Sequence, residues 1–588
     1  MKHNDPPFYR SRKLIVLVLA LMIAAAVLVA LRGFLPPSRD GRSKLASGGH
    51  TPAERRNLLL LTLDTTRADR IGCYGYEAAR TPALDRIAER GVAFDAAYAV
   101  TPLTLPSHTT ILTGLYPVFH GVRNNGRYEL PGEYTTLAEM FREGGWRTGA
   151  FISAFVLHSR FGLAQGFESF GDDLTAGHPK LTSMEIQSRS GQQTVEDALA
   201  WLRETHRRKF FLWVHFFDPH MPYRAPRKFQ EAFSHNPYDG QIAYMDSVIG
   251  TLISRLERWG VLRDTLVVVI ADHGESLGEH GEQTHAFFIY NAAMRVPLIF
   301  SQPGVLPEGK RLDASVSMAD VAPTVLEYFG LPAPPELQGK SFLDAMQGSA
   351  VLDHRSVLIE SVFPFEAYNW APLSGLLHGS EKYIKAPQPE YYDLARDPNE
   401  TANLWDDQPQ RRASLVKRYE ETFEKLRKAE NETVSSRRAM SEEEEETLRS
   451  LGYVFGARES RAEPADLRDP KDAIAMHELL RDAENLQNVS DLDGMQRDLE
   501  NIMKKDPTNY QAVYILASLH EMKGRWDEAL PLYEKAIRLR PKKGMAWIGI
   551  GRYHMERGDS SKAKEHFLMA TNDKHCSDAY VMLSLLYG

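Results

Sequence analysis

The sequence predicts an α/β domain built around a mostly parallel sheet, followed by an all-α domain of helical repeats. Two observations predict this order. Between residues 56 and 404, apolar runs alternate with helix-like stretches, and several of the runs end in aspartate. Beyond residue 471, a pattern of small residues recurs every 34 residues. The chain of 588 residues exceeds what one hydrophobic core usually serves, so two or more folded units are expected.

The composition excludes several classes of protein. Hydrophobic residues make up 43% of the chain and charged residues 25%, which is ordinary globular usage and not that of a disordered or collagen-like chain. The formal net charge of −8 lacks the basic excess of nucleic-acid-binding proteins, so no nucleic-acid partner is expected. The only cysteines, Cys73 and Cys576, provide neither a disulfide framework nor a thiolate zinc site.

The N-terminus predicts a membrane anchor. Residues 1–13 are basic, and Leu14–Leu31 contains no polar side chain. As a helix this stretch measures about 27 Å, close to the hydrocarbon thickness of a bilayer. The alternative is a cleavable signal peptide, whose apolar region usually covers only about 7–15 residues. Residues 32–55, which include a Pro-, Ser- and Gly-rich stretch, are expected to form a linker.

Four apolar runs are typical of strands that are buried on both faces of a parallel sheet. They are Asn57–Leu63, Phe210–Phe217, Thr265–Ala271 and Val296–Phe300. Three of them are followed directly by Asp64, Asp218 and Asp272. Open α/β sheets bind ligands at the carboxyl ends of their strands, so these carboxylates are expected to converge on one site.

Helix-like segments lie between the strands, at Pro82–Arg90, Thr135–Glu143, Val195–Arg203 and Ile242–Arg258. This alternation predicts a layered α/β domain at residues 56–404. Residues 405–470 are helical and charged, and they end in a linker. The acidic run Ser441–Glu446 within them suits the first turn of a helix better than a binding tail.

The last part of the chain, residues 471–588, contains an internal repeat. Five small or proline residues recur 34 positions later, as the pairs Pro507 and Pro541, Ala512 and Ala546, Gly524 and Gly558, Ala529 and Ala563, and Ala536 and Ala570. This is the pattern of tetratricopeptide repeats, whose paired helices bury their apolar faces only by stacking. Such repeats either bind a protein partner or serve to cap or dimerise the rest of the chain.

The region from about Arg56 to Leu404 resembles the sulfatase branch of the alkaline phosphatase superfamily. Six motifs carry the resemblance, in the order and spacing of the family: LDTTRADRIGCYGY (Leu63–Tyr76), TPLTLPSHTTILTG (Thr101–Gly114), FFDPHMPY (Phe216–Tyr223), IADHGESLGEHG (Ile270–Gly281), RVPLIF (Arg295–Phe300) and YYDLARDPNETANL (Tyr391–Leu404). The resemblance implies an alkaline-phosphatase-like fold and an enzyme that cleaves phosphate or sulfate esters.

The resemblance also implies a divalent metal ion, held by Asp64, Asp272 and His273 with Thr104 as a further ligand. An isolated aspartate after a strand is commonly a helix cap or a turn residue, but the adjacent histidine favours a metal site. Two carboxylates and an imidazole suit zinc or manganese better than calcium, which prefers a shell of oxygen ligands.

The sequence departs from the sulfatase pattern at the nucleophile. The family's C-x-P-S-R motif aligns with Thr104-Leu-Pro-Ser-His108, which lacks the cysteine that becomes formylglycine and has His108 in place of arginine. Two metal-ligand positions differ as well, where Thr65 replaces a carboxylate and His273 replaces an amide. A threonine nucleophile resembles the lipid phosphoethanolamine and glycerophosphate transferases and the nucleotide pyrophosphatases of the superfamily.

Thr104 precedes a predicted helix that runs from Pro106 to Gly114. A nucleophile at a helix N-terminus faces N–H groups and the positive end of the helix dipole, which stabilise an alkoxide and an anionic ester. A threonine at this position can also be a simple helix cap. The neighbouring metal motif favours the nucleophile.

Several histidines are candidates for catalysis or substrate binding. His220 and His285 match family positions that line the substrate pocket, where they would donate hydrogen bonds to ester oxygens or protonate the leaving group. His108 joins them because it aligns with the family's arginine. A second metal ion would need His215 and Asp218 as ligands in addition to His220 and His285. A single metal ion is therefore favoured.

Two weaker candidates are Asn125 and His280. Asn125 lies in an Asn-Gly pair and is interpreted first as a turn residue. His280 is a weaker candidate because exposed histidines are common.

These observations predict a membrane-anchored, metal-dependent hydrolase that cleaves phosphate or sulfate esters through a covalent Thr104 ester. One alternative is a transferase that passes a phosphoryl-linked group to a lipid or glycan. The other is an inactive sulfatase-like scaffold that binds partners through its repeats. By analogy with related enzymes, the single span would hold the catalytic domain outside the cytoplasm, on the periplasmic side in a bacterium. The sequence does not specify whether the substrate is a lipid, a glycan or a small molecule.

Overall fold

A computed structural model describes residues 57–174, 188–429 and 467–483 without a break, most of 491–587, and part of 436–448. The predicted anchor Leu14–Leu31 and linker 32–55 lie outside these residues, as does part of the segment 405–470. Among the helices that the structure describes, none is both long and apolar enough to cross a membrane.

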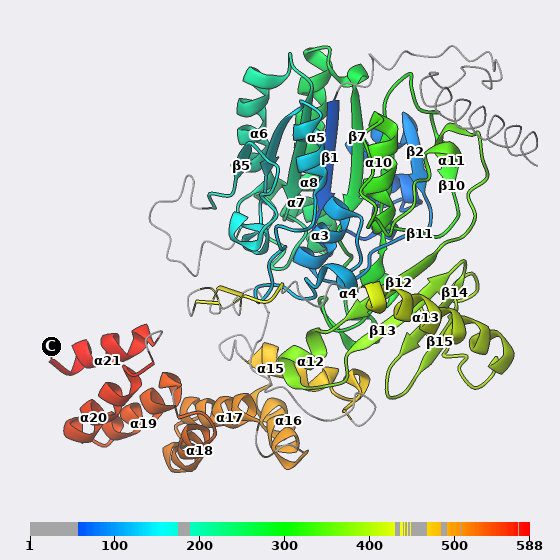
Figure 1. Ribbon diagram of the computed structural model, residues 1–588. Helices are drawn as coiled ribbons and strands as arrows, with labels where there is room; N and C mark the ends of the chain where they lie inside the picture. The colour runs from blue at the N-terminus through cyan, green and yellow to red at the C-terminus, as the bar shows by residue number, and fades with distance from the viewer. Residues whose placement is uncertain are drawn as a thin grey trace, which may run out of the picture. The chain divides into compact units, whose positions relative to one another are not determined.

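An eight-stranded sheet lies at the centre of the first domain, in the order β10-β2-β9-β7-β1-β6-β4-β5 (Figure 1). Its strands are β1 (Asn57–Leu63), β2 (Gly91–Phe94), β4 (Arg147–Phe151), β5 (Ser169–Gly171), β6 (Phe210–Phe216), β7 (Thr265–Ala271), β9 (Leu298–Ser301) and β10 (Lys310–Leu312). Every neighbouring pair is parallel except the two that β9 makes with β7 and β2. The predicted mostly parallel sheet is confirmed.

The three central strands β1, β6 and β7 are buried along their whole length, which explains their continuous apolar sequences. The fourth predicted strand, Val296–Phe300, is instead divided. Pro297 has no N–H to donate to a sheet and separates β8 (Arg295–Val296) from β9. β8 joins a small sheet with β3 (Ala97–Tyr98) and β11 (Val316–Ser317).

Helices cover the sheet. In the view of Figure 1, helices α3, α5 and α10 lie in front of it, while α8 packs against α2, α6 and α7. The helices of this domain are α2 (Pro82–Glu89), α3 (Thr104–Thr113), α4 (Pro117–His120), α5 (Leu137–Glu143), α6 (Gly191–Thr205), α7 (Arg227–Ala232), α8 (Pro237–Arg258), α9 (Asn291–Met294), α10 (Val321–Phe329), α11 (Leu343–Gln347) and α12 (Phe363–Tyr368).

A four-stranded antiparallel sheet follows the main sheet in the chain. It consists of β12 (Ser356–Ser361), β13 (Leu373–His378), β14 (Glu381–Lys385) and β15 (Glu390–Asp393). Helix α13 (Pro409–Ala429) packs against β12, β13 and β14.

The C-terminal part is helical throughout its described residues, as predicted. It contains α15 (Ile474–Ala483), α16 (Leu492–Lys505), α17 (Tyr510–Met522), α18 (Trp526–Leu539), α19 (Gly544–Glu556), α20 (Ser560–Ala570) and α21 (Ser577–Tyr587). Helix α17 pairs with α18, and α19 pairs with α20, so that each pair forms one repeat. The alanines of the repeat pattern are all buried where these helices meet, at positions 512, 529, 536, 546, 563 and 570.

Glycine allows the closest of these helix contacts. A Cβ atom at Gly549 would lie 2.4 Å from Cζ of the fully buried Tyr533 ring, and the φ angle of Gly549 is ordinary for a helix. Gly549→Ala should therefore destabilise the repeats by about 1–2 kcal/mol, because overpacking outweighs the gain in helix propensity.

Urea unfolding followed by far-UV circular dichroism measures this loss. Gly132→Ala is the control, since nothing lies within 4 Å of its added Cβ. If Gly549→Ala unfolded at the same or a higher urea concentration than the parent protein, this packing would be wrong.

Candidate active site and metal centre

The parallel pairing of β1 with β7 places two aspartates side by side. Leu63 is in register with Ala271, so Asp64 and Asp272 follow at adjacent strand ends. The Asp272 N–H donates to the carbonyl of Leu63 at 3.3 Å, and the Thr65 N–H donates to Asp272 Oδ1 at 3.2 Å. Both aspartates are fully buried. The predicted convergence of these two strand ends is present.

Asp64, Asp272 and His273 offer ligand atoms that lie within 4.8 Å of one another. His273 Nδ1 donates to the carbonyl of Gly274 at 2.9 Å, which leaves the lone pair of Nε2 for a metal, an arrangement common among metal-binding histidines. Both Asp64 carboxylate oxygens and Asp272 Oδ2 are buried and lack a well-aligned hydrogen bond among the described residues, although Nε2 of His215 lies 3.3 Å from Asp64 Oδ2. Buried carboxylates without partners are costly, so these residues fit a divalent cation.

The electrostatics of this cluster also fit a cation. Burial raises the pKa of Asp64 well above its usual range, and the charges of Asp272 and Glu275 raise it further. Burial raises the pKa of Asp272 in the same way and lowers that of His273. The pocket alone thus disfavours every charged form, and a bound cation would stabilise the carboxylates in their ionised form.

Thr104 is the first residue of helix α3, two positions before the predicted start, and it is fully buried. Its Oγ1 lies 3.4 Å from His273 Nε2, so the proposed nucleophile and the proposed metal ligand are neighbours. The helix ends as predicted at Gly114, whose positive φ of 71° closes the last turn.

Asn125 lies next to the start of α3 rather than in an exposed turn. Its Oδ1 accepts a hydrogen bond from the Leu105 N–H at 2.9 Å, and the side chain is fully buried. Its Nδ2 has no partner among the described residues. The first interpretation of Asn125, a turn residue, therefore omits its contact with the start of helix α3.

His108 and His215 approach the two aspartates from the side of α3 and β6. His108 Nδ1 donates to the carbonyl of Thr104 at 2.8 Å and lies 3.7 Å from Asp272 Oδ2. His215 Nε2 lies 3.3 Å from Asp64 Oδ2, while its Nδ1 accepts the N–H of Ser153. His108, His215 and Asp272 also satisfy the spacing of a metal site. Sequence reasoning considered His215 only for a site beside His220, and the structure places it beside Asp64.

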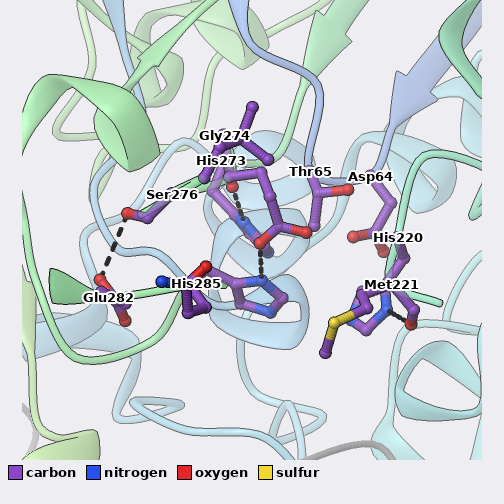
Figure 2. Close-up of polar contacts among 12 residues, drawn as sticks. Asp64, Thr65, His220, Met221, His273, Gly274, Ser276, Glu282 and His285 are labelled. Atoms are coloured by element: carbon purple, nitrogen blue, oxygen red, sulfur yellow. Dashed lines mark hydrogen bonds and ion pairs between the residues drawn. The ribbon is translucent and has the colours of Figure 1, made fainter. Parts of the chain in front are cut away.

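His220 and His285 lie near His273 (Figure 2). The ring centroids of His220 and His285 are 5.1 Å apart, and the His285 centroid is 4.5 Å from that of His273. His220 Nδ1 donates to the carbonyl of Met221 at 2.6 Å, so Nε2 is an acceptor when the ring is neutral. Burial lowers the pKa of His220 to about 4 and that of His285 to about 3. Both imidazoles are therefore neutral near pH 7, and Nε2 of His220 suits a proton acceptor better than the predicted donor.

Glu275 is a site residue that sequence reasoning missed. Its Oε1 shares a 2.8 Å hydrogen bond with His285 Nδ1, and its Oε2 accepts from Tyr223 Oη at 3.2 Å. Burial raises the pKa of this carboxyl to about 8. Glu275 lies two residues after His273 within the motif Ile270–Gly281, and this position in the sequence could have identified it as a candidate.

Two other predicted candidates lie apart from the cluster. Asp218 Oδ1 accepts the N–H of Gly191 at 3.1 Å, at the start of α6, and burial raises its pKa to about 6. His280 stacks on Tyr290 and makes a hydrogen bond to the carbonyl of Asn399. Neither belongs to a cluster of three or more metal-ligating side chains among the described residues, although Oδ2 of Asp218 is buried without a hydrogen-bond partner there.

The chain matches different known families in its catalytic region and in its C-terminal helical region. Residues 56–331 match the sulfatase family, and residues 278–429 match the C-terminal domain of N-sulphoglucosamine sulphohydrolase. Residues 491–544 and 523–575 match the tetratricopeptide repeat.

Similar proteins include an ulvan-active sulfatase of Formosa agariphila, 25% identical over 59% of this chain and 76% of that protein. Arylsulfatase K of Rattus norvegicus is 24% identical over 68% of this chain and 82% of its own length. Among solved structures, the phosphonate monoester hydrolase of Agrobacterium radiobacter superimposes with a TM-score of 0.55 at 22% identity, over 64% of this chain and 96% of that one. That structural likeness establishes the fold.

The metal cluster generates a direct prediction. Asp272→Asn should reduce metal affinity by more than about 100-fold, because it removes a charged ligand and not only an outer-shell partner. Metal content after dialysis, measured by mass spectrometry of the elements, reports the loss. Asp218→Asn, at a partly buried carboxylate outside the cluster, should keep its metal. Stoichiometric metal in Asp272→Asn would show that the cluster is not the site.

Proposed function

The chain belongs to the sulfatase family of the alkaline phosphatase superfamily, with tetratricopeptide repeats after its catalytic domain, and we propose that it hydrolyses phosphate esters through a covalent intermediate on Thr104. One observation carries the proposal. A buried threonine hydroxyl, 3.4 Å from His273 Nε2, stands where the family's motif has the cysteine that becomes formylglycine.

The chemistry of that hydroxyl favours phosphate over sulfate. A formylglycine hydrate expels sulfate with the help of its second hydroxyl on the same carbon. Thr104 has a single hydroxyl, so a sulfate on it could leave only by attack of water at sulfur or by C–O cleavage. A threonine phosphate is open to in-line attack by water at phosphorus, the ordinary second step of phosphoryl transfer.

We assign deprotonation of the attacking water to His220, whose Nε2 is an acceptor in the neutral ring. In the first step the Thr104 oxygen bonds to phosphorus as its proton passes to water, the bond to the alcohol breaks on the opposite side of phosphorus, and the leaving alkoxide takes a proton from water. In the second step water bonds to phosphorus from that opposite side and gives a proton to Nε2 of His220, the bond to Thr104 breaks, Thr104 takes a proton from water, and His220 returns its proton to the solvent.

A divalent cation held by Asp64, Asp272 and His273 would lower the pKa of the Thr104 hydroxyl and neutralise negative charge on the phosphoryl oxygens. Because one of these ligands is an imidazole, we propose zinc or manganese rather than calcium. The unpartnered buried carboxylates argue against an inactive scaffold, since an idle site has no physical need for them.

Sulfate ester hydrolysis is the second candidate function, because the similar proteins include several sulfatases. We further propose that Leu14–Leu31 anchors the chain in a membrane with the catalytic domain outside the cytoplasm. The repeats would then present this domain to a protein partner or to a second copy of the chain, since stacked repeats form extended binding surfaces.

Substitution of the nucleophile tests the proposal. Thr104→Ala should abolish turnover of phosphate esters, whereas Thr104→Ser should keep a hydroxyl and much of the rate. Initial rates on matched aryl phosphates, phosphodiesters and sulfates, with zinc or manganese supplied, provide the measurement. Phosphate turnover by the parent protein should exceed sulfate turnover.

Thr113→Ser is the matched control, since this buried threonine lies in the same helix and its hydroxyl donates to the carbonyl of Thr109 and accepts the N–H of Leu115, bonds that a serine hydroxyl can also make. It should leave the rate unchanged. Efficient sulfate release by the parent protein with phosphate esters untouched would reject the preference for phosphate. An active Thr104→Ala variant would reject the nucleophile.

A further inference from the structure

The segment that leads from the catalytic domain to the repeats, residues 467–483, packs against the catalytic domain. The Ala371 N–H donates to the carbonyl of Arg468 at 2.9 Å, and Lys471 Nζ donates to Glu390 Oε1 at 2.9 Å. Ala473 and Ile474 are buried in the main core of the catalytic domain. The start of the helical extension is therefore a fixed part of this domain.

One face of helix α15 lies against the loop that carries His285. Ile474, His477, Glu478 and Arg481 occupy positions i, i+3, i+4 and i+7, which share one helix face. The His477 ring lies 4.5 Å from the Phe287 ring, two residues after His285. The Glu478 side chain accepts the N–H of Gln283 at 2.8 Å, two residues before His285.

The His477 ring also bonds to the domain beyond that loop, since its Nδ1 lies 2.9 Å from Tyr368 Oη. Glu478 and His477 thus hold the loop on both sides of His285. The helical extension therefore borders the loop that carries His285.

Arg481 extends this face by one further turn. Its Nη2 lies 2.8 Å from Glu478 Oε2, and about a quarter of its side chain (25%) is exposed. Glu478 in turn accepts the N–H of Gln283, two residues before His285. His285 bonds to Glu275, which accepts from Tyr223 Oη, so a short series of contacts links the guanidinium to this side of the site.

The geometry points to helix α15 as one wall of the substrate pocket, with Arg481 binding a second anionic group of the substrate, remote from the ester that is cleaved. A planar guanidinium pairs with phosphate, sulfate and carboxylate oxygens through two parallel hydrogen bonds. The substrate class is therefore an ester that carries a further oxyanion. This inference rests on the proposed hydrolysis of esters at Thr104, and it concerns how that site selects its substrate.

The test compares an aryl phosphate without a second charge to aryl phosphates that carry a carboxylate, a sulfate or a second phosphate on arms of increasing length. In the full-length parent protein, at least one of the doubly anionic esters should have the lower KM. Arg481→Gln should raise the KM of that doubly anionic ester about tenfold with kcat unchanged. It should change the KM of the singly charged ester less than about twofold. Arg481→Lys should recover part of the loss.

Glu478→Gln should change the KM of the doubly anionic ester in the opposite direction. The amide oxygen can still accept the Gln283 N–H, but the carboxylate that competes for Arg481 is gone, so the KM of the doubly anionic ester should fall. A purely structural role of α15 would raise KM in both variants. Arg497→Gln, at an exposed arginine of the next helix α16, is the control and should change neither KM.

Equal increases of KM for both kinds of ester in Arg481→Gln would overturn the inference, as would an increase in Glu478→Gln or a parent protein that does not prefer a second anion. Failure of the proposed function gives a different result, namely no turnover of any phosphate ester. If sulfate esters alone are cleaved, the same matched series of sulfate esters decides the role of Arg481.

Discussion

The site depends on the parallel pairing of β1 with β7, which brings the carboxylates of Asp64 and Asp272 together in a fully buried position. Two adjacent carboxylates in a low dielectric repel each other and are poorly solvated, so the arrangement needs a cation or protons. The neighbouring groups are consistent with a cation. His273 directs Nε2 toward Thr104, and its Nδ1 is held by a backbone carbonyl. Helix α3, which begins at Thr104, the proposed nucleophile, starts beside these groups.

Much of the fold could be predicted from the sequence because its elements carry local signals. Strands buried on both faces are continuously apolar, as β1, β6 and β7 are, and the 34-residue period fixes the helix pairs of the repeats. The prediction was wrong where a local feature intervened, as where Pro297 divides a strand. The sulfatase family, the α/β fold and the repeats are confirmed, while the membrane anchor stays a prediction.

The site was predicted less completely, because its contacts join distant parts of the chain. Asp64, Asp272 and His273 follow apolar strands and could be identified from that position. The place of His215 beside Asp64 and the bond of Glu275 to His285 arise only when strands and loops meet in space. Composition likewise gives no sign of the contacts that residues 467–474, the end of the predicted linker and the start of the predicted repeat domain, make with the catalytic domain, such as the bond of Lys471 to Glu390.

The account centres on a covalent phosphate at Thr104, and trapping that intermediate tests it most directly. The full-length protein, supplied with zinc or manganese and an aryl phosphate, is quenched in acid during turnover, and its peptides are sequenced by mass spectrometry. The account predicts a phosphoryl group on Thr104 during turnover and none after the substrate is exhausted. Turnover of the ester with Thr104 unmodified, or with the phosphoryl group on another residue, would contradict it.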